Sequence, residues 1–159
     1  MSWYLCEKRK SRTEINGTVI VSIRSMNEIK EHKKRIIRVL LVEDDKYLNE
    51  AIKSHLECEG YVVEQMFSYK DTKRVVKKNE KYDILMVDFK LTNSIGKTGI
   101  DVYEEIKAAY PGIKAIMVSG YGDYKVKKEA FKAGIDRFLD KPFFLEQLSF
   151  IITNLTEVL

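Results

Sequence analysis

Several short apolar runs in this sequence end abruptly on charged residues of a kind that can do chemistry together. The run at 82–87 stops on Asp88, and the run at 38–42 stops on Glu43 and Asp44. Carboxylates crowded together raise one another's pKa unless a cation relieves the repulsion. Mg²⁺ suits such a place because it prefers oxygen ligands and keeps several waters. If the two runs lie side by side, these three carboxylates are candidates for a Mg²⁺ site.

Two further runs end on a hydroxyl and an ammonium group. The run at 115–118 ends on Ser119, and the run at 137–140 is followed by Lys141. Carboxylates, a metal, a hydroxyl and an ammonium together suit a phosphoryl group, which needs positive charge around its equatorial oxygens and an in-line nucleophile. We predict that Asp88 is this nucleophile and forms an aspartyl phosphate.

Each of these residues, taken singly, also has an ordinary structural explanation. An Asp at the end of a strand is commonly a turn residue, and a Ser is commonly a cap. Glu43 and Asp44 could simply favour the start of a following helix, where negative charge is stabilising. Because four separate run ends match one chemistry, we favour a shared site over four unrelated turns.

The elements that must position these residues alternate along the chain from Ile36 onward. Five strands alternating with five helices indicate a parallel sheet with right-handed crossovers and helices on both faces. We expect a flavodoxin-like (βα)5 doubly wound α/β fold with strand order 2-1-3-4-5, which gathers the run ends at one edge of the sheet. The expected strands are 38–42, 61–67, 82–88, 115–119 and 137–140, and the expected helices are 46–59, 68–78, 99–110, 123–133 and 143–158.

The composition bounds the class of protein. A chain of 159 residues with 45% hydrophobic and 33% charged residues suits one soluble domain with a short appendage. No apolar run approaches the roughly 20 residues that cross a membrane, and the first residues lack the pattern of a secretory signal. Two cysteines form neither a disulfide framework nor a metal motif, so we expect a cytoplasmic protein with no membrane association and a partly buried Cys58.

Residues 1–35 differ from the rest of the chain, and we treat them as an extension of the domain at 36–159. They hold nine Lys and Arg against four Asp and Glu, whereas the remainder holds 19 against 20. Two short strands around Asn16-Gly17 and a polar helix are one interpretation, and a disordered basic tail is the other. For the basic excess we favour a solvated segment over nucleic-acid binding.

Four segments now form a combined pattern: VEDD at 42–45, DILMVD at 83–88, VSG at 118–120 and DKPF at 140–143. With these motifs, the chain from about Ile36 to Leu159 resembles a response regulator receiver domain of two-component signalling.

The resemblance implies a phosphoacceptor in a signalling pathway or phosphorelay rather than an enzyme. Asp88 would accept a phosphoryl group from the phosphohistidine of a sensor histidine kinase or a phosphotransfer protein. Asp44, Asp88 and the main-chain carbonyl of Lys90 would ligate Mg²⁺, and Glu43 would act on the metal through water.

The resemblance also implies a switch. Ser119 and Lys141 would bind the phosphoryl oxygens, Phe138 would turn inward as Ser119 moves, and the Lys141-Pro142 bond would be cis. The face made by the fourth helix, the fifth strand and the fifth helix would then change and bind a partner protein or a second copy in a homodimer. Residues expected on that face are Tyr124, Lys125, Lys128, Lys132 and Phe144.

Three features depart from the family pattern. The loop at 89–99 lacks the family's usual proline and is about three residues longer. Phe138 stands at the switch position without a hydroxyl to bond Ser119. Lys90 and Tyr121 flank the site where family members tune the lifetime of the phosphate.

Three other functions compete with the receiver interpretation. A hydrolytic phosphotransferase would have a motif in which the nucleophile is followed two residues later by a second Asp. Here that position is Lys90. A flavin or nucleotide site would want a glycine- or hydroxyl-rich loop after the first strand, and the acidic residues at 43–45 would repel a phosphate there. A phosphorylation-independent scaffold would not need the acidic residues. No DNA-binding or enzymatic module follows the last expected helix, so we expect a stand-alone receiver or one cut from a longer chain.

Overall fold

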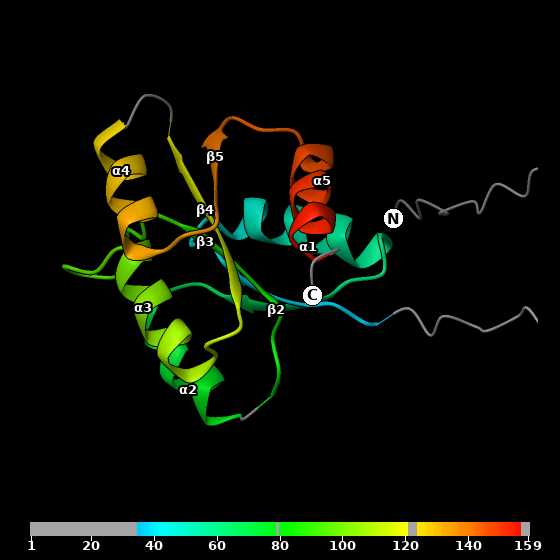
Figure 1. Cartoon of the computed structure of the whole chain (residues 1–159), viewed down its shortest axis with the longest axis horizontal. Helices are drawn as coiled ribbons and strands as arrows, with labels where there is room; N and C mark the ends of the chain where they lie inside the picture. The colour runs from blue at the N-terminus through cyan, green and yellow to red at the C-terminus, as the bar shows by residue number, and fades with distance from the viewer. Residues whose placement is uncertain (1–34, 79, 121–123, 157–159) are drawn as a thin grey trace, which may run out of the picture. The chain divides into compact units, whose positions relative to one another are not determined.

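The expected alternation of strands and helices is present in the structure, a computed structural model that describes residues 35–78, 80–120 and 124–156 (Figure 1). The hairpin, helix or tail considered for residues 1–34 lies outside the described residues, as does Tyr121. In the described part of the chain, no helix is long and apolar enough to cross a membrane.

Five strands form one parallel sheet in the order β2-β1-β3-β4-β5, which confirms the predicted topology. Pairing of β1 with β3 sets Val42 opposite Val87, so the carboxyl ends of the two central strands lie next to each other. The strands are β1 (Arg38–Val42), β2 (Val62–Met66), β3 (Ile84–Asp88), β4 (Lys114–Gly120) and β5 (Arg137–Lys141).

Helices cover both faces of the sheet (Figure 1). On one face lie α1 and α5, and on the other lie α2, α3 and α4. The helical segments are α1 (Lys46–Cys58), the short 3-10 turn η1 (Tyr69–Asp71), α2 (Thr72–Lys77), α3 (Gly99–Ala109), α4 (Tyr124–Ala133) and α5 (Leu145–Thr156).

The two faces of the sheet are both apolar because alternate residues of the central strands point to opposite sides. In β3, Leu85 and Val87 pack toward α2, α3 and α4, whereas Ile84 and Met86 pack toward α1 and α5. All five residues of β3 are buried, as expected for the central strand of a doubly wound sheet. Burial of apolar area on both faces, at about 25 cal/mol per Å², is the main stabilising contribution.

Local signals explain where α1 begins and ends. The Asp45 side chain accepts hydrogen bonds from the backbone N–H groups of Tyr47 (2.9 Å) and Leu48 (3.1 Å), which makes it the predicted N-cap. Gly60 follows the helix with φ of +90°, a conformation that favours glycine. Cys58 in the last turn is exposed, so the expectation of a partly buried thiol was wrong.

The second helical segment differs from the single helix expected at 68–78. The chain forms the 3-10 turn η1 and then a helix of six residues. Asp71 causes the division because its carboxylate accepts the backbone N–H groups of Phe67 (2.9 Å) and Ser68 (3.1 Å), fixing a tight turn before α2 begins. Sequence periodicity alone cannot separate such a turn from the helix that follows it.

Candidate functional site

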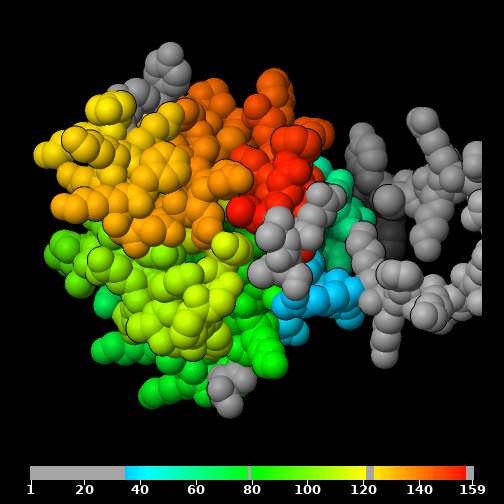
Figure 2. Space-filling model, in the orientation of Figure 1, coloured from blue at the N-terminus to red at the C-terminus, as the bar shows by residue number. Residues whose placement is uncertain are grey.

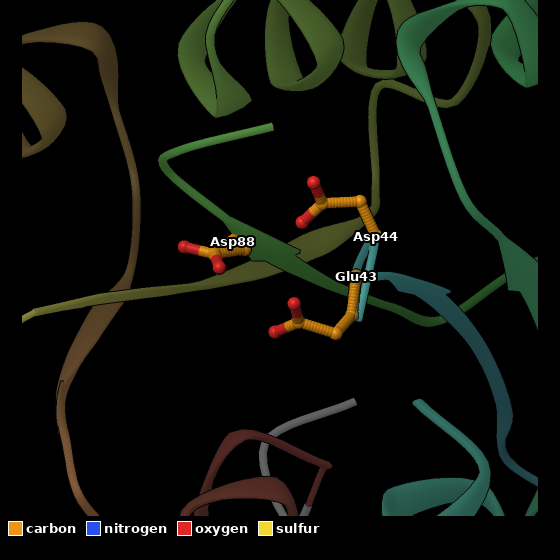
Figure 3. A group of neighbouring side chains, drawn as sticks. All are labelled: Glu43, Asp44 and Asp88. Atoms are coloured by element: carbon orange, nitrogen blue, oxygen red, sulfur yellow. The ribbon is translucent and has the colours of Figure 1, made fainter. Parts of the chain in front are cut away.

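Three carboxylates meet at the carboxyl ends of the central strands (Figure 3). Glu43 and Asp44 directly follow β1, and Asp88 is the last residue of β3. One oxygen atom from each lies within 4.8 Å of the others. Oxygen donors in this number suit a hard divalent cation, so the donor set fits the Mg²⁺ site that the sequence suggested.

Lys141 joins this cluster from the end of β5. Its Nζ lies 2.6 Å from Glu43 Oε2 and 2.5 Å from Asp88 Oδ2, and its side chain is only 25% exposed. The ammonium group therefore bridges two of the carboxylates and partly neutralises them. The structure brings together four of the predicted site residues.

The cluster perturbs the ionisation of its buried members. Burial is the largest influence on Glu43 and raises its pKa, and the negative charge of Asp88 adds to this, although the Lys141 hydrogen bond opposes it. Burial also works against the Lys141 ammonium, but its hydrogen bonds to Asp88 and Glu43 outweigh burial and raise the pKa of Lys141 above 10.5. Lys141 is thus held charged beside the carboxylate expected to carry a phosphoryl group.

The backbone around Asp88 leaves little room. Asp88 is 7% exposed, and its Oδ1 accepts a hydrogen bond from the Lys90 N–H at 3.2 Å. A Cβ on Gly99, the first residue of α3, would overlap the carbonyl of Asp88 and lie 3.0 Å from the Cα of Phe89. Glycine at position 99 is therefore what allows the loop to return so close to the site.

Ser119 lies on β4, the strand next to β3, and Phe138 lies on β5, the edge strand that pairs with β4. Ser119 is buried near the end of β4, where it pairs with Asp140, the neighbour of Lys141. Phe138 on β5 is half-buried and packs against the core on the side of α4. The Lys141–Pro142 peptide bond is cis, which confirms that expectation.

Three side chains that the sequence did not reveal also contact the site. Asn49 of α1 is fully buried and donates its side-chain N–H to the carbonyl oxygen of Glu43 at 2.7 Å. Thr92 in the loop after β3 bonds the Asp44 carboxylate. Lys127 of α4 lies 2.5 Å from Asp140 and 5.1 Å from the ring centroid of Phe138. No motif marks these residues, because their roles depend on contacts that only the fold brings together, with partners 6, 48 and 13 positions away.

The expected output face is exposed. Tyr124 is 79% and Phe144 75% exposed, and the structure adds two exposed aromatic residues, Phe131 of α4 and Phe150 of α5, that the sequence analysis did not name. Figure 2 shows α4, in yellow and orange, and α5, in red, at the surface of one side of the molecule. The expected lysines on α4 are also exposed: Lys125, Lys128 and Lys132.

Comparison with known proteins agrees with this fold and site. Residues 39–153 match the family model of the response regulator receiver domain. The chain therefore belongs to the receiver domain family of two-component response regulators. Receiver domains are signalling domains that generally bind Mg²⁺ at an acidic pocket and interact with histidine kinases or phosphotransfer proteins, and dimerisation is common among response regulators.

Two curated relatives show how much of a longer protein the chain matches. A Thermotoga maritima protein named cyclic di-GMP phosphodiesterase is 34% identical over 116 residues, covering 73% of this chain and 30% of that protein. The transcriptional regulatory protein RprY of Bacteroides fragilis is 31% identical over 116 residues, covering 73% and 48%. The chain thus spans less than half the length of either relative.

Solved receiver domains match over nearly their whole length. One from Clostridium thermocellum has a TM-score of 0.69 and 28% identity, covering 77% of this chain and 95% of that chain. A CheY-like receiver domain protein from Methanospirillum hungatei has a TM-score of 0.67 and 30% identity, covering 77% and 96%.

Proposed function

We propose that this chain receives a phosphoryl group on Asp88 from the phosphohistidine of a sensor histidine kinase or a phosphotransfer protein, in the cytoplasm. The observation that carries this proposal is the position of Asp88 at the carboxyl edge of the sheet. One of its oxygens lies within 4.8 Å of an oxygen of Glu43 and of Asp44, and its Oδ2 lies 2.5 Å from the Lys141 ammonium. This arrangement combines a nucleophile with the positive charge that a transferring phosphoryl group requires.

The residues that would hold Mg²⁺ are Asp44, Asp88 and the main-chain carbonyl of Lys90, with Glu43 acting through water. The ion would supply positive charge that offsets the crowded carboxylates and the phosphoryl oxygens. The Lys141 ammonium already supplies one positive charge to Glu43 and Asp88. The carboxylates therefore bind a cation even without Mg²⁺.

The chemistry of transfer follows from the groups around Asp88. A carboxylate oxygen of Asp88 attacks phosphorus and forms a P–O bond, while the P–N bond to the donor imidazole breaks and its electron pair stays with the imidazole nitrogen. Lys141 exchanges its contact with Asp88 for a phosphoryl oxygen. The Ser119 hydroxyl donates to another oxygen, drawing the end of β4 toward Asp88.

The output would be a change of the α4, β5 and α5 face. As Ser119 moves, Phe138 turns into the space behind it, and the equilibrium between two arrangements of this face shifts. Phe138 has no hydroxyl, so ring burial alone couples it to Ser119. The exposed aromatic residues Tyr124 and Phe150 support binding of a partner protein or a second copy of the chain on this face.

The proposed function also needs a surface for the donor protein, and an apolar hollow next to the site suits it. An apolar hollow of about 510 Å³ borders Lys141 and lies between α1 and the segment that follows β5. We propose that the donor protein buries apolar side chains in this hollow, because Lys141 both lines the hollow and contacts Asp88. Residues lining the hollow are Leu48, Ala51, Lys141, Pro142, Phe143 and Leu145.

An enzyme remains the alternative that the experiment must exclude. Lys90 stands two residues after Asp88, at the position where a hydrolytic phosphotransferase would have a second Asp. The name of the Thermotoga maritima relative describes a whole protein of which this chain covers 30%, so the name does not carry phosphodiesterase activity to this chain.

Labelling with a small phosphodonor separates these functions. We expect the full chain, incubated with acetyl phosphate and Mg²⁺, to take up about one phosphoryl group per molecule, and Asp88→Asn to take up none. Asp45→Asn is the matched control, because it removes a neighbouring carboxylate outside the cluster while Asn still caps α1. Continuous hydrolysis of the donor over many turnovers would instead indicate an enzyme.

A further inference from the structure

Thr92 donates two hydrogen bonds to one carboxylate oxygen of Asp44. The Thr92 backbone N–H lies 2.9 Å from Asp44 Oδ2, and the Thr92 hydroxyl donates to the same oxygen. We propose that Thr92 is a positioning residue that presents Asp44 to Mg²⁺, an inference that rests on the function proposed above. It acts through Asp44 and does not itself contact the metal.

The contact leaves the other oxygen of Asp44 for the metal. In the described part of the chain, no donor lies within hydrogen-bond distance of Asp44 Oδ1. Figure 3 shows one carboxylate oxygen of Asp44 turned toward Glu43 and Asp88 and the other turned away. Asp44 lies just beyond β1 and is only half-buried, so without a partner its side chain would be free to rotate. Hydrogen bonds to a ligating carboxylate fix its orientation in this way.

The loop that carries Thr92 is itself held in place. Leu91 is buried in the core, and the buried Ser94 accepts the Tyr69 N–H on its Oγ at 2.8 Å. Lys97 lies 2.8 Å from Asp101 at the start of α3. These contacts fix the loop on both sides of Thr92. The hydrogen bonds from Thr92 to Asp44 are therefore made by an ordered part of the loop.

Residue identity explains why this chain can make the contact. A proline at position 92 would lack the N–H that bonds Asp44 at 2.9 Å. A threonine supplies both the N–H and a hydroxyl. The absence of proline from this loop, a departure from the family pattern, therefore has a specific role in this chain.

The test measures Mg²⁺ binding directly, without phosphorylation. MgCl₂ is titrated into the full chain by isothermal calorimetry, and unfolding in EDTA is followed by circular dichroism. Thr92→Val keeps the shape and the N–H but removes the hydroxyl, whereas Thr92→Ser restores the hydroxyl. Asn93→Ala is the matched control, because Asn93 is an exposed neighbour on the same loop.

We expect Thr92→Val to weaken Mg²⁺ binding about tenfold, the lower end of the range for outer-shell partners of metal ligands. Thr92→Ser and Asn93→Ala should bind within about twofold of the native chain, since both keep the two donors to Asp44. The Tm in EDTA should be the same for Thr92→Val and Thr92→Ser, because the role concerns the metal and not folding.

Native Mg²⁺ affinity in Thr92→Val would overturn this inference while leaving the proposed function intact. So would a loss in Thr92→Ser equal to that in Thr92→Val, since the hydroxyl would then be irrelevant. A native chain that binds no Mg²⁺ would overturn the proposed function together with the inference.

Discussion

At the scale of single residues, Glu43 is an acidic group of the site whose ionised form is opposed by its burial. Glu43 is 3% exposed, and burial raises its pKa even though it bonds the Lys141 ammonium at 2.6 Å. When folding raises the pKa of an acidic group, the folded protein has a lower free energy of unfolding with that group ionised than with it protonated. In the function proposed above the Glu43 carboxylate acts only when Mg²⁺ is bound, so the cost of burying its charge falls on the metal-free protein.

Replacing Glu43 by Gln should therefore stabilise the protein in EDTA. At neutral pH we expect a gain of about 1 kcal/mol, or ~3 °C in Tm, because a neutral amide has no charge to desolvate. The gain should shrink as the pH falls through the raised pKa and be absent below 4.5, where Glu43 is protonated in both states. Thermal melts of both proteins across this pH range measure it.

Glu57→Gln is the control for this effect, because Glu57 is exposed on α1 and its replacement should leave Tm unchanged. A lower Tm for Glu43→Gln at neutral pH would show that the Lys141 contact outweighs burial, contrary to this account. Addition of Mg²⁺ should raise the Tm of the native chain by more than it raises the Tm of the Glu43→Gln variant.

At the scale of elements, Lys127 of α4 contacts two residues of β5. Lys127 pairs with Asp140 at 2.5 Å and lies 5.1 Å from the centroid of Phe138. The ion pair with Asp140 keeps the Lys127 ammonium beside the Phe138 ring, which packs on the side of the sheet that α4 covers. A cation over an aromatic ring contributes about 0.5–1 kcal/mol at exposed sites, so we propose that Lys127 favours the present position of the Phe138 ring over the inward position proposed for the phosphorylated protein.

Replacing Lys127 by Met should release Phe138 before any phosphoryl group is present. Loss of about 0.5–1 kcal/mol corresponds to a two- to fivefold rise in the population of the inward ring. Fluorine NMR of protein labelled with fluorophenylalanine, with the Phe138 signal assigned from Phe138→Leu, measures the two populations. Lys128→Met, the exposed neighbour on α4, should leave them unchanged.

Equal shifts in Lys127→Met and Lys128→Met would contradict this account, because they would reflect the net charge of α4 rather than the contact with Phe138. An unchanged Phe138 signal in Lys127→Met would show that ring burial alone fixes its position.

The elements also show what can be derived from sequence. The strand order follows from the alternation of apolar runs and helical spacing, and the meeting of Glu43, Asp44 and Asp88 follows from that order. Element ends were less well predicted because tertiary contacts decide them. For example, α5 begins at Leu145 rather than Phe143, since the Gln147 side chain accepts the Phe144 N–H at 2.9 Å.

Side chains that support the site could not be found from sequence. Thr92 bonds a residue 48 positions away, and nothing in its neighbours marks it as different from any loop threonine. Lys127 has the spacing of an ordinary solvated helix face, and its role depends on β5 lying beside α4. Local patterns describe which face a residue occupies, whereas such contacts depend on the packing of distant elements.

At the scale of the whole molecule, the chain divides between Arg35 and Ile36. The residues of the candidate site lie between Glu43 and Lys141, and the family model covers residues 39–153. We therefore propose that residues 36–159 form the receiver domain and that residues 1–35 are an extension with a separate role. The acceptor chemistry should then not depend on the extension.

A fragment of residues 36–159 should be labelled by acetyl phosphate within about twofold of the full chain, because both sheet faces are covered within this unit. Labelling and sedimentation of both proteins, with and without the phosphodonor, measure acceptor activity and assembly separately. A folded fragment that is not labelled would show that residues 1–35 contribute to the site.

The most direct test of the central claim identifies the residue that carries the phosphoryl group. Borohydride reduces an acyl phosphate to an alcohol, so a phosphorylated aspartate becomes homoserine and can be located by peptide mass spectrometry. We predict homoserine at position 88 after treatment with acetyl phosphate and Mg²⁺, and none in Asp88→Asn. Homoserine at another position, or a phosphoryl group found only on a hydroxyl residue, would contradict the account.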